Sequence, residues 1–224
     1  MEKTKRNRAK TTQRILDAFE EVLAERGLHH VGVNRVAERA GVSKVLIYRY
    51  FGGLEGLVEH YTKQGTLFPT FTPAVLAQLR PADNSELGRV WYRQIVQIFR
   101  QFRTSQAARE LLKANTISND SLADAASKAL DDETLRLITQ LSYIESPHSK
   151  AISAIAVAAM SYMTLMADNN RTMVGIDLRS DAGWEEIEQA LKLIYVALGR
   201  TVTAPVAAVK AAQTEVSVSN GHWK

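Results

Sequence analysis

The sequence contains no cysteine among its 224 residues. Without cysteine the chain forms neither a disulfide bond nor a thiolate metal site, and this composition agrees with a reducing cytoplasm. No apolar stretch follows the first ten residues, MEKTKRNRAK, so we expect no secretory signal. The sequence therefore predicts a cytoplasmic protein.

Patterns that carry catalysis are also missing. The sequence has neither a glycine-rich phosphate loop nor a nucleophile elbow. Its five histidines show no metal-ligand spacing with one another or with carboxylates. The acidic run at residues 131–133 is typical of a solvated helix face. We therefore expect no catalytic residue, no metal site and no cofactor, and these absences argue against an enzyme.

No run of alternating β-branched residues is bounded like a strand, whereas almost every segment has helical periodicity. We therefore predict an all-α fold of about nine helices. Thr11 or Thr12 is expected to cap the first helix, and the next three are expected to begin near Gly32, at Ser43 and after Gly53. The later helices are predicted at residues 72–79, 85–102, 105–114, 120–142, 147–168 and 181–198.

One uncharged segment, residues 151–167, could be mistaken for a membrane span. It holds six alanines, two serines and a threonine, which makes it short and weakly apolar for a bilayer. We predict instead a helix buried on all sides within a larger helical protein, and no association with a membrane.

Positive charge is concentrated at the N-terminus. Residues 1–10 contain five basic residues and one acidic residue, so this short arm carries +4, and the formal net charge of the whole chain is also +4. A basic arm of this kind is either a disordered tail or a contact for nucleic acid.

The segment that follows the first helix has the pattern of two short helices joined by a tight turn. In VNRVAERA, residues 33–40, the apolar side chains Val33, Val36 and Ala37 share one face. Gly41 tolerates the positive φ that such a turn needs, and the Ser43 hydroxyl can cap the next helix. This is the pattern of a helix-turn-helix, although a helical hairpin with core aromatic residues is the alternative.

The helix that begins at Ser43 has two different faces. Ile47 and Phe51 lie four residues apart and are the expected core contacts. The opposite face and its flanks consist of Lys44, Val45, Leu46, Tyr48 and Arg49. Lysine and arginine can reach guanine, apolar side chains can meet thymine methyls, and tyrosine hydroxyls can reach phosphates. This face is therefore the predicted DNA-reading surface, and Ser43 at its start belongs to the same set.

The stretch GVNRVAERAGVSKVLIYRYFGGLEGL resembles the DNA-binding domain of TetR-type transcriptional regulators. The resemblance covers about residues 10–58. The positions that match the family pattern in register are Val36, Ala37, Ala40, Gly41, Val42, Ser43, Tyr48, Tyr50 and Phe51. It implies that Tyr48 and Tyr50 hold phosphates, and that Asn34 reaches the backbone or an adjacent base. It also implies a homodimer that binds a palindromic operator in double-stranded DNA.

Three positions depart from the family pattern. Gly32 stands where threonine or serine usually caps the second helix, so this cap contributes less. Val45 and Leu46 replace a small residue and a hydroxyl, which makes the reading surface more apolar. Leu54 stands in the place of a phosphate-binding lysine, a loss that the basic arm could offset.

These observations divide the chain into four parts. Residues 1–10 are the basic arm and residues 11–58 the helix-turn-helix domain. Residues 59–200 are expected to form a larger helical domain for ligand binding and dimerisation, and residues 201–224 to form a disordered tail.

An apolar stripe on the last helix predicts a dimer interface. Its residues step by three and four along the helix, as in a coiled-coil seam, although such a stripe can also pack on its own domain. The stripe consists of Trp184, Ile187, Leu191, Ile194 and Leu198. The preceding helix is rich in alanine, which permits close approach of helices.

The larger domain also offers candidates for an effector pocket. They are aromatic residues and methionines at helical spacing, which line adaptable pockets but are also common in plain cores. The candidates are Trp91, Tyr92, Phe99, Phe102, Tyr143, Met160, Met163 and Met166. Because they are apolar, we expect a small hydrophobic or aromatic effector that releases a repressor from DNA.

Two other functions stay open. One is a ligand-independent DNA architectural or division-control factor, and the other is a helical small-molecule binding protein or enzyme whose N-terminal resemblance is vestigial. Specific retardation of duplex DNA would exclude the second alternative.

Overall fold

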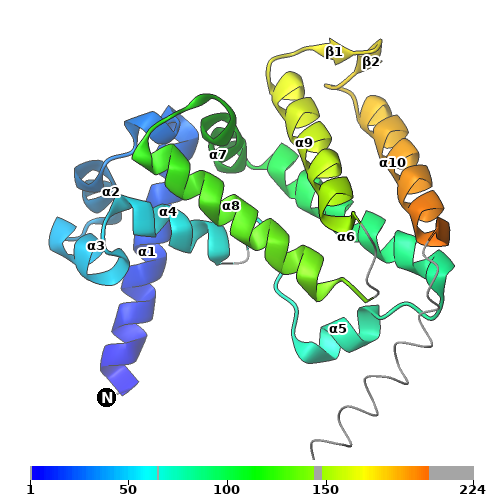
Figure 1. The fold of residues 1–224 in the computed structure, drawn as a ribbon. Helices are drawn as coiled ribbons and strands as arrows, with labels where there is room; N and C mark the ends of the chain where they lie inside the picture. The colour runs from blue at the N-terminus through cyan, green and yellow to red at the C-terminus, as the bar shows by residue number, and fades with distance from the viewer. Residues whose placement is uncertain (1, 65, 144–147, 202–224) are drawn as a thin grey trace, which may run out of the picture. The chain divides into compact units, whose positions relative to one another are not determined.

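Helices dominate the computed structural model, which describes residues 2–64, 66–143 and 148–201 (Figure 1). The described part of the chain contains ten α-helices and a short 3₁₀ helix, so the predicted all-α fold is confirmed. The α-helices are α1 (Glu2–Arg26), α2 (Val33–Ala40), α3 (Lys44–Phe51), α4 (Leu54–Lys63), α5 (Pro73–Leu79), α6 (Asn84–Thr104), α7 (Gln106–Ile117), α8 (Ser121–Gln140), α9 (Ser149–Asp168) and α10 (Asp181–Thr201). The 3₁₀ helix η1 (Leu28–His30) joins α1 to α2.

Hydroxyl side chains cap the N-termini of several of these helices. The Oγ1 atom of Thr72 accepts a hydrogen bond from the Val75 amide, and Pro73 occupies the first turn of α5. Ser105 Oγ accepts from the Ala108 amide at 3.1 Å. Such caps satisfy amides that have no partner within the helix, and substituting the cap residue by alanine typically costs about 1 kcal/mol.

The start of one helix differs from the prediction, and a second predicted start is not described. Helix α1 begins at Glu2 rather than at Thr11 or Thr12, because its basic first turns continue the same helix. Thr11 lies inside it and donates its hydroxyl to the carbonyl oxygen of Asn7 at 2.8 Å. The predicted start at Pro147 lies outside the described residues, and α9 begins at Ser149.

A short hairpin between α9 and α10 was not predicted. Its strands, β1 (Thr172–Met173) and β2 (Ile176–Asp177), pair antiparallel, with Met173 opposite Ile176. Strands of two residues are too short to show alternation of polar and apolar residues, so the sequence pattern could not reveal them. The predicted tail beyond residue 201 lies outside the described residues.

The helices form two compact units. The first contains residues 1–69 and 100–134, and the second contains residues 70–99 and 135–224. The predicted boundary between residues 58 and 59 lies within the first unit, which also contains α7 packed against α1. Helices α1 to α4 thus share one unit with α7.

The first unit has a continuous core around α1. Ile15, Phe19 and Leu23 are fully buried on one face of this helix. The ring of Phe19 lies 5.2 Å from that of Tyr61 on α4, measured between ring centroids. Burial raises the pKa of the Tyr61 hydroxyl well above its usual range. This core joins α1 to α4, the two helices that flank α2 and α3 in the sequence.

The second unit brings α6 against α10 at two glycines. A Cβ atom on Gly88 would lie 2.2 Å from the carbonyl oxygen of Tyr195, and one on Gly199 would lie 2.8 Å from the carbonyl oxygen of Asn84. Glycine at these positions therefore permits the close approach of the two helices. Burial raises the pKa of Tyr195 to about 12.

Helix α9 is much more exposed than predicted. Residues Lys150–Asp168 are long and apolar enough to cross a membrane, but one such helix is weak evidence for a span, and only 11% of the window is buried. Ile155 is 70% exposed and Tyr162 is 52% exposed. The prediction of burial on all sides is therefore wrong, because one face of α9 is not covered by another element among the residues that the structure describes.

Candidate nucleic-acid interface

Helix α2 is held against α1 by ionic contacts on the surface. The guanidinium of Arg39 pairs with Glu21 at 3.0 Å and with Glu25 at 2.8 Å. The hydrogen bond from Arg39 lowers the pKa of the Glu25 carboxyl, and the same contact raises the pKa of Arg39. Exposed pairs of this kind contribute little to stability, so they fix the orientation of α2 more than they strengthen the fold.

The turn between α2 and α3 has the geometry expected of a helix-turn-helix. Gly41 is left-handed, with φ of 62°, and its amide donates to the carbonyls at the end of α2. The amide of Val42 donates to the carbonyl of Ala37 at 2.9 Å. Ser43 then caps α3 by accepting a hydrogen bond from the Val45 amide at 3.4 Å. The sequence predicted both the turn and the cap.

Helix α3 presents two faces, as its sequence predicted. Ile47 is fully buried and anchors the helix to the core. Val45 is 63% exposed and Tyr48 is 54% exposed, although both are large side chains with apolar surface. Lys44 and Arg49 are exposed as well. Helix α3 therefore offers solvent a surface that combines cations, apolar groups and phenol hydroxyls.

The core side of α3 is less buried than predicted at its end. Phe51 is half-buried, and its ring meets that of His60 on α4 edge to face, with centroids 5.2 Å apart. Leu46 is also half-buried. Leu54 is half-buried at the first position of α4, where the family pattern has a lysine.

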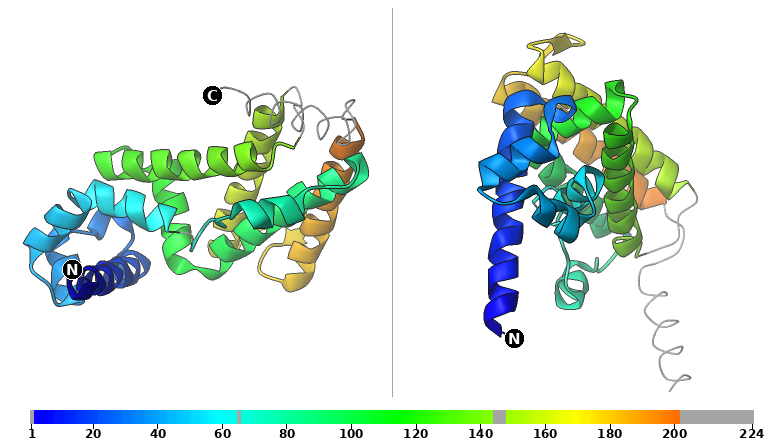
Figure 2. Two further views of the ribbon diagram at one scale, coloured as in Figure 1. Left: turned by 90° about the horizontal axis from the view of Figure 1, so that it is seen from below. Right: turned by 90° about the vertical axis from the view of Figure 1, so that its left-hand side faces the viewer.

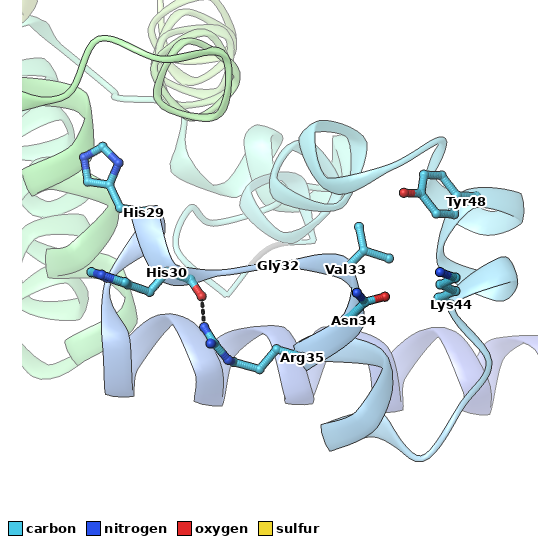
Figure 3. A pocket seen from close by; sticks show the side chains of 8 residues that line it. All are labelled: His29, His30, Gly32, Val33, Asn34, Arg35, Lys44 and Tyr48. Atoms are coloured by element: carbon cyan, nitrogen blue, oxygen red, sulfur yellow. Dashed lines mark hydrogen bonds between the residues drawn. The ribbon is translucent and has the colours of Figure 1, made fainter.

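An open pocket of about 660 Å³ lies beside the exposed face of α3 (Figure 3). Its lining comes from η1, the beginning of α2 and the first turns of α3, and consists of His29, His30, Gly32, Val33, Asn34, Arg35, Lys44 and Tyr48. Three of the predicted DNA-binding residues, Asn34, Lys44 and Tyr48, therefore meet in one concavity. His29, His30 and Arg35 also line it, although nothing in the spacing of these residues in the sequence connects them to α3.

Gly32 at this pocket has the weak cap that the sequence predicted. Its backbone is extended, and no side chain there accepts a hydrogen bond from the first amides of α2. Arg35 is held by a hydrogen bond to the carbonyl oxygen of His30 (Figure 3). The uncapped amides of α2 and the cations Arg35 and Lys44 make this concavity attractive to anions.

A second cluster lies at the other end of α3, around Tyr50. The guanidinium of Arg8, on α1, lies 5.0 Å from the centroid of the Tyr50 ring, and the guanidinium of Arg49 lies 5.2 Å from it. Arg49 also donates a hydrogen bond to the Tyr50 hydroxyl at 3.4 Å. The basic N-terminal arm is thus part of α1 and contacts α3.

His29 connects the edge of the pocket to α7 and α8. Its Nδ1 atom lies 2.9 Å from the carboxylate of Asp120, and its Nε2 atom lies 2.7 Å from the hydroxyl of Ser118. Asp120 also accepts hydrogen bonds from the amides of Leu122 and Ala123 and so caps α8. These partners are about ninety residues away in the sequence, so no local pattern could predict them.

The predicted effector residues do not all belong to one unit. Phe102 is buried in the first unit, where its ring lies 5.8 Å from that of Phe68. The other seven belong to the second unit. There the Trp91 indole donates to the carbonyl of Leu141 at 3.0 Å, and the Tyr143 hydroxyl donates to the carbonyl of Leu76 at 3.1 Å.

Burial in the rest of the predicted effector set varies. Phe99 and Met160 are buried, whereas Tyr92, Met163 and Met166 are half-buried. These placements suit either a plain core or the lining of a pocket, so the effector site stays a prediction.

The predicted dimer stripe is divided by burial. Trp184, Ile187 and Leu191 are buried within the chain itself. Ile194 is 60% exposed and Leu198 is half-buried. The first part of the stripe therefore packs inside the second unit, which was the alternative that the sequence left open.

The fold and the interface define an all-α helix-turn-helix protein. Residues 15–61 match the model of the bacterial regulatory proteins of the tetR family. Two uncharacterised HTH-type transcriptional regulators of Mycobacterium tuberculosis are each 40% identical to this chain over 53 residues. That match covers 24% of this chain and 26% of each relative, so it spans about a quarter of these curated relatives. Residues 15–61 are therefore similar to the N-terminal DNA-binding region of the tetR family.

Solved structures of bacterial regulators share the fold over most of the chain. NalD, the secondary repressor of the MexAB-OprM multidrug efflux pump in Pseudomonas aeruginosa, matches with a TM-score of 0.57 and 18% identity, over 82% of this chain and 96% of NalD. The fatty acid degradation regulator FadR from Bacillus halodurans matches with a TM-score of 0.55 and 17% identity, over 82% of this chain and 97% of that FadR. FadR from Bacillus subtilis, in complex with stearoyl-CoA, matches with a TM-score of 0.54 and 18% identity, over 82% of this chain and 97% of that protein. At these identities the likeness establishes the fold.

Proposed function

We propose that this protein is a sequence-specific DNA-binding transcriptional regulator, a repressor that a small hydrophobic or aromatic effector releases from DNA. One observation carries the proposal. Helix α3 is anchored by the buried Ile47 and exposes Val45, Tyr48 and Arg49 on its other side. A regulator of this kind acts in the cytoplasm, where it reaches the DNA.

The size and chemistry of α3 suit the major groove. This groove is about 12 Å wide and admits an α-helix, and the first residues of such a helix lie closest to the base edges. Lys44 and Val45 are therefore proposed to read bases, by hydrogen bonding to guanine and by contact with thymine methyls. Tyr48 and Asn34, which line the same pocket, are proposed to bind the phosphate backbone.

Substitutions on α3 test this assignment. Tyr48→Ala should weaken binding to all duplex sequences by about the same factor, because a phosphate contact carries no sequence information. Lys44→Ala should weaken binding to the preferred sequence most, by about 1–3 kcal/mol if it reads a guanine. Fluorescence anisotropy with labelled duplexes measures both effects. Arg93→Ala, on the exposed side of α6, is the control that removes one charge elsewhere.

Wild-type behaviour of these variants would contradict the proposed role of α3. If folded Tyr48→Ala and Lys44→Ala proteins bind duplexes with wild-type affinity and preference, α3 is not the reading helix. If wild-type protein shows no preference among duplexes, the protein is not a sequence-specific regulator.

We further propose that the protein acts as a homodimer. Two-fold symmetry places two copies of α3 over the half-sites of a palindromic operator. Large apolar side chains exposed on α9 and α10 support this proposal, because such side chains are candidates for burial at an interface between subunits. These side chains are Ile155, Tyr162, Leu193 and Ile194, with exposures of 70%, 52%, 73% and 60%.

The effector is proposed to bind among the apolar residues of the second unit, near Trp91, Phe99 and Met160. Gln94 lies on α6, as Trp91 and Phe99 do, and its buried Oε1 atom has no hydrogen-bond partner among the described residues. An unpaired buried acceptor is costly, and an effector with a hydrogen-bond donor would satisfy it. We therefore expect a mainly hydrophobic effector that carries at least one donor.

A thermal-shift screen with hydrophobic, polar and metal panels tests this part. A true effector should both stabilise the protein and release bound DNA, and by linkage the DNA should weaken effector binding by the same factor. A tenfold loss of DNA affinity corresponds to about 1.4 kcal/mol of coupling. Effects from polar metabolites or metals alone would contradict the proposed pocket. If no compound acts and many genomic sites are bound, a ligand-independent architectural factor is the better description.

A further inference from the structure

Two cations converge on one aromatic ring at the end of α3. Arg8 comes from α1 and Arg49 from α3, and their guanidinium carbons lie 5.0 and 5.2 Å from the centroid of the Tyr50 ring. Arg8 is exposed, and Tyr50 is half-buried. The attraction between a guanidinium and an aromatic face orients the Arg8 side chain toward the side of α3 that carries Arg49.

This arrangement places two positive charges beside one ring, with no anionic partner for either among the described residues. In the described part of the chain, neither Arg8 nor Arg49 has a carboxylate within ion-pair distance. Arg39, one helix away, shows the contrast, because it pairs with two carboxylates. Like charges repel, so a site with Arg8, Arg49 and the Tyr50 hydroxyl is suited to an anion that accepts hydrogen bonds.

The first turns of α1 point to the same ligand. They have the sequence EKTKRNRAK and extend α1 beyond the helix-turn-helix (Figure 2). Basic residues at a helix N-terminus are unfavourable, because the helix dipole is already positive there. A row of phosphates beside this end of α1 would stabilise it. The charge of the arm and the Tyr50 cluster therefore both favour a polyanion.

We propose that Arg8 and Arg49 hold one backbone phosphate of the DNA beside Tyr50, and that the first turns of α1 follow the phosphates flanking the bases that α3 reads. This inference rests on the proposed DNA-binding function and adds an element outside the helix-turn-helix to it. Tyr50 acts here as a positioning residue for Arg8 as well as a phosphate ligand.

The helical form of the arm indicates whether it contacts the DNA backbone or enters the minor groove. An α-helix with its side chains is about 10–12 Å in diameter, whereas the minor groove is about 6 Å wide. The arm as a helix does not fit into the minor groove and lies along the backbone instead. Its contribution to affinity is therefore independent of sequence and strongly dependent on salt.

Substitution of Arg8 tests the inference. Arg8→Ala removes an exposed side chain and leaves a good helix former, so the protein should fold. It should weaken binding to every duplex about tenfold and lower the slope of log K against log salt by about 0.9. Arg8→Lys keeps the charge but not the planar stack on Tyr50. Its salt slope should therefore be closer to that of the wild type than its affinity is.

Two controls separate the proposed phosphate contact of Arg8 and Arg49 from other effects. Arg26→Ala removes the same charge at the opposite end of α1 and should leave the slope unchanged. Tyr50→Leu removes the ring, so the loss from Arg8→Ala should be smaller in that background than in the wild type. Additive losses would contradict positioning by Tyr50.

Three further outcomes would overturn the inference. They are wild-type affinity and slope in Arg8→Ala, an equal slope change in Arg26→Ala, and a loss that depends on whether the flanking pairs are A·T or G·C. The last result would indicate an unwound arm in the minor groove. If wild-type protein binds DNA, and Tyr48→Ala weakens that binding while Arg8→Ala does not, only the proposed phosphate contact of Arg8 and Arg49 is contradicted. If wild-type protein does not bind DNA, the proposed function fails with it.

Discussion

The guanidinium of Arg14, on α1, donates a hydrogen bond to the carbonyl oxygen of Ala40 at the end of α2. A second bond runs from Arg14 to the carbonyl of Gly41 at 3.2 Å. The last carbonyls of a helix lack partners within it, and a cation there also opposes the negative end of the helix dipole. Arg14 therefore fixes the point at which the chain turns from α2 toward α3.

Gly41→Ala should destabilise this turn. Gly41 has φ of 62°, which an L-residue adopts at a cost of about 1–2 kcal/mol, and the new Cβ atom would lie 3.0 Å from Nη2 of Arg14. We expect the free energy of unfolding in urea to fall by that amount. Gly41→Asn should lose less, because asparagine tolerates the left-handed region. An unchanged midpoint for Gly41→Ala would mean that the turn is not left-handed in solution.

Val174→Asn should stabilise the second unit. Val174 and Gly175 form the two-residue connection between β1 and β2, with φ of 50° and 83°. Positive φ at both positions is typical of a type I′ turn, which favours asparagine followed by glycine and disfavours a β-branched residue. Val174 is also 97% exposed, so little packing is lost. We expect a gain of about 1 kcal/mol and a rise in Tm of about 3 °C by calorimetry.

The matched variant for this hairpin is Val174→Ala. Alanine lacks the β-branch but does not favour the left-handed region as asparagine does, so its gain should be smaller. A loss of stability in Val174→Asn would show instead that the exposed valine makes a contact, such as one across the dimer.

Ile194→Arg should break the proposed dimer without unfolding the chain. Ile194 is 60% exposed in the single chain, so a charge there meets solvent in the monomer and an apolar interface in the dimer. Burying an unpaired charge costs several kcal/mol, and monomers are therefore expected in sedimentation equilibrium. Val75→Arg, at an exposed apolar residue of α5, is the control and should stay dimeric.

Leu191 belongs to the predicted dimer stripe, but it is packed inside its own chain. Its side chain is only 8% exposed in the single chain. Leu191→Arg should therefore reduce the stability of the monomer itself, and aggregation is the expected outcome. A folded, dimeric Leu191→Arg protein would contradict the packing of α10, and a folded dimer of Ile194→Arg with unchanged affinity would move the interface elsewhere.

The sequence predicted the buried and exposed sides of α3 well because the determinants of burial are local there. Ser43, Ile47 and Val45 lie within one short helix, where periodicity alone decides which side chain is buried. Gly41 and its left-handed turn were predicted for the same reason, since only the conformational freedom of glycine was at issue.

Contacts between distant segments could not be predicted in this way. The stack of Arg8 on Tyr50 and the bond from His29 to Asp120 depend on how α1 and α8 pack against the rest of the first unit. Periodicity also shows that a helix has an apolar face without showing what covers it. For that reason Leu191 and Ile194, which share one predicted stripe, differ in burial, and α9 is exposed where burial was expected.

The most direct test of the account is to sequence the genomic DNA fragments that the purified protein retains at physiological salt. We expect strong enrichment of a few fragments that share an inverted repeat, with half-sites about 34–36 Å apart or a multiple of that spacing. Retention should also be lost in the Tyr48→Ala protein. Retained fragments that match the input in composition and share no symmetric sequence would contradict the claim that this protein is a sequence-specific regulator.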